Sequence, residues 1–146
     1  MLSPPSLFYQ SRSPVAIISL LNFSTMRFIT KQFHAYIDYP VAIVLFVLPF
    51  LLGFTGPALW ISVATGLAAF SLTLLTNHQT GALKLIPYSW HLAVDGLVGL
   101  TFVLLPFVLG FGGLEAIYYW VNGAAVLTVV ALHKPETTTS PLRAVA

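Results

Sequence analysis

One apolar segment that occurs twice most constrains what this chain can fold into. Residues 34–54 carry Asp38 as their one charged side chain, and residues 91–111 repeat the pattern around Asp95. Each segment is about as long as the ~20 residues that an α-helix needs to cross the hydrocarbon core of a bilayer. The sequence therefore predicts a membrane-spanning helix in each copy.

The composition of the chain supports the same class of protein. Apolar residues make up 58% of the 146 residues and charged residues only 7%, whereas a soluble domain has roughly a quarter charged residues. We therefore expect the surface to contact membrane lipids. No basic stripe with interleaved aromatic residues is present, which excludes nucleic acid as a partner. The absence of cysteine excludes disulfides, thiolate metal sites and thiol catalysis.

Glycine and proline turns divide the apolar part of the chain into four predicted spans. The expected fold is an all-α membrane protein whose four transmembrane helices form two tandem helical-hairpin repeats. Pro40 is placed in the first turn of the first span, where a missing N–H costs little. The spans are predicted at residues 36–54, 58–75, 92–111 and 114–132.

The two repeats keep one register throughout. Adding 57 to any position from 34 to 76 reaches its counterpart without a gap, and the matches include His, Asp, Pro and Gly residues. Such matches indicate a duplication, because an apolar background does not produce them. Two hairpins in tandem share one orientation, so a pseudo-twofold axis along the membrane normal is expected.

The predicted organisation has five parts. The Ser- and Pro-rich beginning of the chain is predicted to be disordered, with Met26 as a possible true start. The parts are an N-terminal tail (1–33), a first two-helix membrane repeat (34–76), a cytoplasmic loop (77–89), a second two-helix membrane repeat (90–133) and a cytoplasmic tail (134–146).

Basic residues predict the orientation. With four spans, every Lys and Arg falls on the side of the two termini and of the loop that holds Lys84, and the opposite turns hold only Glu115 as a charged residue. The positive-inside rule then predicts a cell-membrane protein with both termini on the cytoplasmic side. Small residues four apart, at Ala58, Ser62 and Gly66, predict one face on which a neighbouring helix approaches closely.

A short motif ends the first span of each repeat. Proline is predicted to kink the helix or to loosen its last turn. The motif comprises Pro49, Phe50, Gly53 and Phe54 in the first copy and Pro106, Phe107, Gly110 and Phe111 in the second.

This motif, together with the aspartate eleven residues before each proline, resembles the SPW-repeat family of small bacterial integral membrane proteins. Gly99 also matches the family pattern. The chain departs from the Ser-Pro-Trp triplet of that family, because Leu replaces the serine and Phe replaces the tryptophan in both copies. The resemblance implies the architecture and carries no activity, since the family has none that is established.

Paired His and Asp residues are the main candidates for chemistry. His34 with Asp38, and His91 with Asp95, are spaced i, i+4 and so share one helical face. Meeting in one bundle, the four would be suited to hold a divalent metal or relay protons. We favour the simpler interpretation, in which each aspartate anchors a helix start at the interface, stabilised by water and by the helix dipole. No metal or other cofactor is then predicted.

The remaining polar and aromatic residues are predicted to be structural. His78 and His133 are interpreted as boundary residues, and Asn122 is expected to hydrogen-bond another helix. Two aromatic belts are expected at the interfaces. They comprise Tyr36, Tyr39, Tyr88 and Trp90 on the cytoplasmic side and Trp60, Tyr118, Tyr119 and Trp120 on the other.

The sequence therefore favours a non-enzymatic multi-pass membrane protein of structural or accessory type. A homo-oligomer or a membrane-protein partner is compatible with this prediction. Two alternatives stay open: a small transporter or channel with a path between the two repeats, and a membrane subunit that binds a metal through the paired His and Asp residues.

Overall fold

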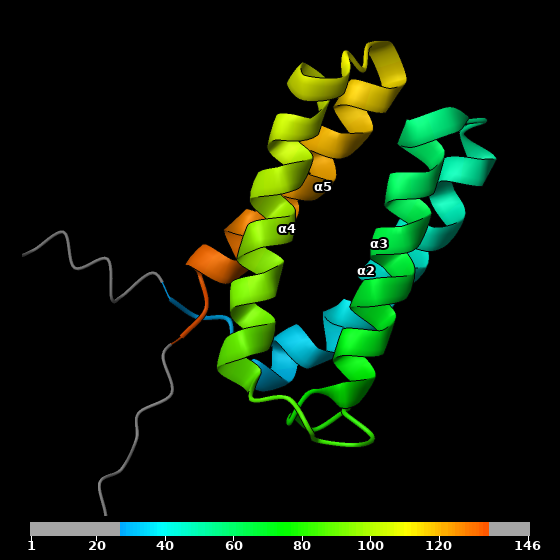
Figure 1. Cartoon of the computed structure of the whole chain (residues 1–146). Coiled ribbons are helices and arrows are strands. Elements are labelled where there is room, and N and C mark those ends of the chain that lie inside the picture. The colour runs from blue at the N-terminus through cyan, green and yellow to red at the C-terminus, as the bar shows by residue number, and fades with distance from the viewer. Residues whose placement is uncertain (1–26, 135–146) are drawn as a thin grey trace, which may run out of the picture.

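The computed structural model describes residues 27–134, and within that range it consists of four helices without a strand. The tails predicted at either end lie outside the described residues, apart from residues 27–33 and residue 134. All four helices are long and apolar enough to cross a membrane. They are α2 (Lys31–Leu51), α3 (Gly56–Leu75), α4 (Tyr88–Leu109) and α5 (Gly113–Ala131) (Figure 1).

The first helix begins earlier than the apolar pattern predicts. Helix α2 starts at Lys31, where Thr30 is the N-cap and its hydroxyl accepts a hydrogen bond from the backbone N–H of Phe33 at 3.2 Å. This start lies five residues before the predicted one, because a capped polar turn precedes the apolar run. Pro40 consequently lies in the third turn of α2, and its predicted place in the first turn is wrong.

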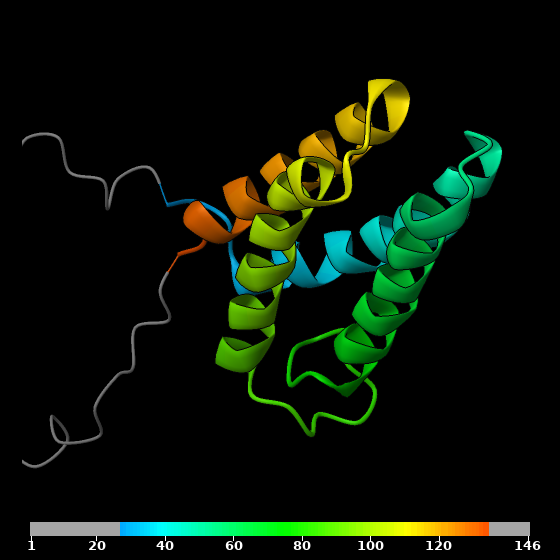
Figure 2. The same cartoon turned by 45° about the horizontal axis from the view of Figure 1, so that its top comes forward.

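The helices form two hairpins, and most helix–helix contacts fall within α2–α3 and within α4–α5. Figure 1 shows both hairpin turns at one end of the molecule and the connection from α3 to α4 at the opposite end. In Figure 2, α2 starts beside the second hairpin and crosses toward the turn that it shares with α3. This crossing brings the start of α2 close to the start of α4.

Small residues set the close packing inside each hairpin. A Cβ atom added at Gly66 would lie 2.7 Å from the backbone nitrogen of Phe46, and one added at Gly123 would lie 2.8 Å from the carbonyl oxygen of Gly99. The two glycines occupy equivalent positions of the repeat. The face of small residues predicted on α3 is confirmed, since Ala58, Ser62 and Gly66 are all buried.

Tyrosines join the two hairpins near their turns. The Tyr119 hydroxyl donates to the carbonyl oxygen of Ala58 at 2.7 Å. The Ser62 hydroxyl donates to the carbonyl oxygen of Leu45 at 2.8 Å and lies 2.6 Å from the Tyr118 hydroxyl. The belt prediction is therefore wrong for Tyr118 and Tyr119, whose hydroxyls find their partners on the other hairpin.

Of the other predicted belt residues, some are exposed on the helix surface and some are buried or bonded to the rest of the protein. Trp60, Trp120, Tyr36 and Trp90 are exposed on the helix surfaces, as a belt requires. Tyr88 is buried, and the Tyr39 hydroxyl donates to the carbonyl oxygen of Thr80 at 2.9 Å. Belts are predicted from residue type alone, which does not distinguish a ring facing lipid from one facing another hairpin.

At the end of the bundle opposite the hairpin turns, backbone bridges join the two repeats. Ile29, before α2, bridges His133, after α5, and Ile86, before α4, bridges Thr76, after α3. Two backbone hydrogen bonds of 2.8–3.1 Å flank each bridge. Both bridges join the entry of one repeat to the exit of the other, and their residues are related by the same offset of 57 positions. The contacts thus follow the register of the sequence repeat.

The proline motifs lie at the ends of α2 and α4. Each helix continues through its proline, Pro49 or Pro106, and ends within three residues of it. Gly53 and Gly110 follow with φ angles of 71° and 69°, the left-handed conformation that glycine adopts without steric cost. The motif therefore stops the helix and turns the chain, and a bend at each proline stays a prediction.

Candidate metal centre

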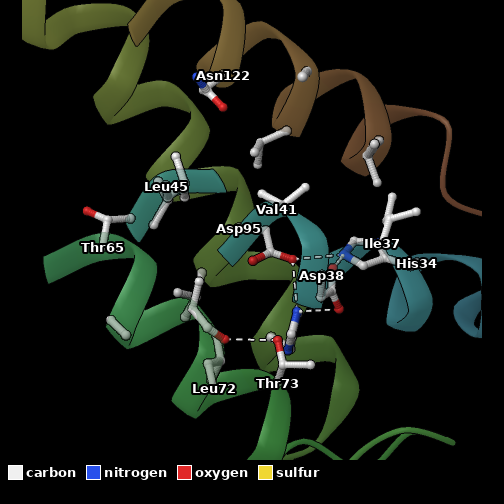
Figure 3. A pocket seen from close by; sticks show the side chains of 18 residues that line it. His34, Ile37, Asp38, Val41, Leu45, Thr65, Leu72, Thr73, Asp95 and Asn122 are labelled. Carbon is white, nitrogen blue, oxygen red and sulfur yellow. Dashed lines mark hydrogen bonds and ion pairs between the residues drawn. The ribbon is translucent and has the colours of Figure 1, made fainter. Parts of the chain in front are cut away.

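The four predicted polar residues lie within the first eight residues of two crossing helices. His34 and Asp38 project from α2, and His91 and Asp95 project from the equivalent positions of α4. Figure 3 shows His34, Asp38 and Asp95 pointing toward one another at one end of a pocket between the hairpins. The structure thus brings both pairs together at a single place, here called the His/Asp cluster.

Each carboxylate in the His/Asp cluster contacts both imidazoles. Oδ2 of Asp95 lies 3.0 Å from Nε2 of His34 and 3.1 Å from Nε2 of His91. Asp38 uses a different oxygen for each histidine: Oδ1 lies 3.2 Å from Nε2 of His34, and Oδ2 lies 3.3 Å from Nε2 of His91. One contact of each aspartate lies within its own helix and the other crosses to the second hairpin.

This geometry revises the interpretation of the aspartates as separate helix-start anchors. Because α2 and α4 begin earlier than predicted, Asp38 and Asp95 are each the eighth residue of their helix. The helix dipole acts mainly within the first turn, so it does not account for their placement. Their partners are the histidines, which are each only 2% exposed. The aspartates therefore belong to one shared site.

A threonine fixes the protonation pattern of one imidazole. The Thr76 hydroxyl lies 2.8 Å from Nδ1 of His91 and donates its hydrogen to the carbonyl oxygen of Leu72 at 2.6 Å. Its oxygen is then left to accept a hydrogen bond from an Nδ1–H of His91. In the neutral ring, Nε2 accordingly carries a lone pair that faces two carboxylates. Either a metal ion between them or a proton on Nε2, which would form the ion pairs of 3.1 Å to Asp95 and 3.3 Å to Asp38, satisfies all three groups.

The spacing of these atoms suits a tetrahedral metal ion. One nitrogen or oxygen from each of the four residues lies within 4.8 Å of all the others. An ion held at ~2.0–2.2 Å by four ligands spaces neighbouring ligand atoms ~3.3–3.6 Å apart, slightly more than the 3.0–3.3 Å of the His–Asp contacts. A small outward shift of the side chains thus makes room for an ion.

One carboxylate oxygen also lacks a hydrogen bond. Asp38 Oδ2 is buried and accepts none from the described residues, although Nε2 of His91 is 3.3 Å away. A buried anionic oxygen without a donor is costly. Two carboxylates with two neutral imidazoles carry a charge of −2, which a divalent cation neutralises.

The second imidazole has a different environment. Nδ1 of His34 is buried and has no hydrogen-bond partner among residues 27–134. The residue equivalent to Thr76 in the other repeat is His133, and its ring centroid lies 6.0 Å from that of His34. Nδ1 of His133 in turn lies 3.3 Å from the Tyr88 hydroxyl. The two halves of the site therefore differ in the side chains behind their histidines.

All four histidines of the chain gather around this site. His78 and His133 are buried, and the ring centroid of His78 is 5.7 Å from that of His91. Burial lowers the pKa of His78 below its usual value, which keeps its ring neutral at neutral pH. His78 and His133 follow the ends of α3 and α5, as predicted, but they are buried beside the His/Asp cluster instead of lying at an exposed boundary.

A cavity of about 300 Å³ extends from the His/Asp cluster between the hairpins. All four helices line it, mostly with aliphatic side chains such as Val41, Val98 and Val126. Thr65 and Asn122 lie at equivalent positions beyond the cluster (Figure 3). The Asn122 amide donates to the carbonyl oxygen of Tyr118 in its own helix at 2.8 Å, so the predicted bond to another helix is wrong.

Sequence reasoning missed the threonines behind the histidines. The repeat offers a signal for Thr76, because Thr76 occupies the position equivalent to His133. Equivalent positions at the ends of the two repeats are expected to have similar surroundings. Thr80, whose hydroxyl lies 3.1 Å from Nδ1 of His78, has no such signal. It acts through a loop whose path depends on tertiary contacts.

Over residues 27–134, fold and site together define four helices suited to span a membrane and a His₂Asp₂ cluster between two hairpins, with buried histidines and partly buried aspartates. No protein-family model, curated protein or solved structure matches the chain.

Proposed function

We propose that this protein is a small multi-pass integral membrane protein of structural or accessory type that binds a divalent transition-metal ion at His34, Asp38, His91 and Asp95. The observation that carries the proposal is the convergence of these four side chains from two hairpins. Imidazole and carboxylate ligands in a tetrahedral arrangement suit Zn²⁺ best among common ions. An ionisable cluster in a span favours a functional role.

The ion would fasten the two hairpins together. Most helix contacts lie within each hairpin, and the tyrosine contacts join the hairpins only near their turns. The His/Asp cluster supplies contacts between the hairpins close to the opposite end. A metal there would add a side-chain clamp at the end that the tyrosines do not reach and that the backbone bridges already join.

A non-enzymatic role agrees with the number of ligands. Catalytic zinc sites have three protein ligands and keep a fourth position for water, whereas structural sites are closed by four. A channel or transporter with a path between the repeats is less favoured. The cavity walls are largely aliphatic and provide few groups to replace the hydration shell of an ion.

The orientation belongs to the same proposal. Both termini and the loop with Lys84 are proposed to face the cytoplasm of a bacterial inner membrane, since the opposite turns contain no Lys or Arg. The likeness to the SPW-repeat family also stays a proposal, supported by the duplicated motif.

Zinc titration of the purified protein in detergent tests the metal proposal. We expect about one Zn²⁺ per chain, and we expect binding to be lost in His91→Gln. The competing arrangement is an ion-pair cluster of two imidazolium and two carboxylate groups without metal. That arrangement predicts no binding above the level of the His91→Gln variant, and such a result would reject the metal proposal.

A further inference from the structure

His78 stands between the His/Asp cluster and an open polar pocket on the surface. This outer pocket is lined by Thr30, Lys31, Gln32, Asn77, His78, Gln79 and Lys84. The ring of His78 packs edge-to-face against that of His91, with the ring planes 80° apart. One histidine side chain thus contacts both the outer pocket and a proposed metal ligand.

The hydrogen bonds of His78 leave one nitrogen unused. The Thr80 hydroxyl donates to the carbonyl oxygen of Ala35 at 3.1 Å, and Nδ1 of His78 lies 3.1 Å from the same hydroxyl oxygen. Thr80 therefore accepts from an Nδ1–H of His78, which leaves a lone pair on Nε2 of the neutral ring.

That lone pair has no partner in the described part of the chain. Nε2 of His78 is buried and without a hydrogen bond, and the side chain is only 4% exposed. Nothing else described for the fold uses this atom. A buried imidazole nitrogen whose tautomer is fixed by a second group is typical of a metal ligand.

We propose that His78 is the entry ligand through which a divalent metal ion passes from the outer pocket to the His/Asp cluster. This inference rests on the proposed metal binding. Nε2 of His78 replaces a water molecule on the incoming ion, and the ligands of the His/Asp cluster then replace His78. No bond other than these coordination bonds changes, and the ion keeps its charge. A buried metal site needs such an entry path.

Stopped-flow mixing of the metal-free protein with Zn²⁺ in the presence of an indicator tests this path. In His78→Gln, we expect both the association and the dissociation rate constants to fall by at least about tenfold, because the ion moves through the same ligand in both directions. The equilibrium Kd should then change by less than about twofold. Unchanged rate constants would overturn the inference.

His133→Gln is the matched control. His133 is also buried and also packs against a ligand, His34, but it does not line the outer pocket. Its substitution should leave the association rate constant nearly unchanged. A raised Kd in His78→Gln with an unchanged association rate constant would instead show that His78 only supports His91, which also overturns the inference.

The charge of the outer pocket gives a second test that leaves the histidines intact. Lys84 lines the pocket and repels an approaching cation, so Lys84→Gln should accelerate zinc binding at low ionic strength and much less at high salt. A rate constant insensitive to this change would exclude entry through the outer pocket. Failure of the unsubstituted protein to bind zinc would reject the proposed function itself, and the entry path with it.

Discussion

Asp95 on α4 reaches the other hairpin, where its Oδ2 atom lies 3.0 Å from Nε2 of His34 on α2. The equivalent contact in the opposite direction joins Asp38 to His91 at 3.3 Å. Each hairpin therefore supplies one histidine and one aspartate to the His/Asp cluster. A site of this kind exists only when both repeats are folded and in contact.

The shared site predicts strong coupling between the two aspartates. Asp38→Asn and Asp95→Asn should each weaken zinc affinity by ~100-fold or more, and the double variant should be little worse than either one, because residues that act through one ion are not additive. Separate helix-start anchors predict mild, nearly additive effects. Zinc titrations of the two single variants and of the double variant distinguish these outcomes.

Thr76 is expected to influence zinc affinity because its hydroxyl orients the imidazole of His91. Thr76→Val removes the acceptor from Nδ1 of His91 and should weaken zinc affinity by about 10–100-fold, whereas Thr76→Ser should retain most of it. Thr73→Val is the matched control, because the Thr73 hydroxyl bonds only the backbone of its own helix, at Ala69. Equal effects of the two valine substitutions would argue against a role of Thr76 in orienting the imidazole.

The tyrosine junction should contribute measurably to stability. Tyr119→Phe leaves the ring in place but removes the 2.7 Å hydrogen bond to Ala58, and should lower the free energy of unfolding by roughly 0.5–1.5 kcal/mol. Tyr36→Phe is the control, since Tyr36 is 58% exposed. Reversible unfolding in detergent provides the comparison, and an equal loss in both variants would contradict the junction.

Close packing within each hairpin gives a pair of symmetric predictions. Gly66→Ala and Gly123→Ala place a methyl group within 2.7–2.8 Å of backbone atoms and should each destabilise the fold by about 1–3 kcal/mol. In Gly96→Ala the nearest atom to the new methyl is a valine side-chain carbon at 3.9 Å, so this control should be nearly neutral. The same unfolding assay ranks the three variants.

The proposed orientation predicts the result of reporter fusions. Reporters placed after Phe54 or Gly112 should report the outer side, and reporters near Lys84 or after Lys134 should report the cytoplasm. With four spans, every Lys and Arg of the chain falls in the Lys84 loop or near the two termini, and the two opposite turns contain none. An external location of the Lys84 loop would contradict the four-span orientation.

The sequence predicts the helices well because their length and hydropathy are local properties. The position at which α2 and α4 end is also determined by local sequence, since Gly53 and Gly110 stop these helices by adopting a left-handed backbone conformation. The pairing of α2 with α3 follows from a short turn and from small residues such as Gly66. These features need no knowledge of the distant parts of the chain.

The site depends on a crossing that the sequence does not specify. Whether Asp95 meets His34 is decided by how two hairpins pack, and spacing within one helix only places His and Asp on a shared face. The same limit applies to Tyr118 and Tyr119, which look like interface anchors by type. Their burial follows from the contact with Ser62 and Ala58 on the other hairpin.

X-ray absorption at the zinc edge of the zinc-loaded protein tests the central claim most directly. The four-residue site predicts a four-coordinate shell of two imidazole nitrogens and two carboxylate oxygens at ~2.0–2.2 Å, with the imidazole signal lost in the His34→Gln, His91→Gln double variant. A six-coordinate shell of oxygens, or an unchanged spectrum in that double variant, would show that zinc binds elsewhere and would contradict the account.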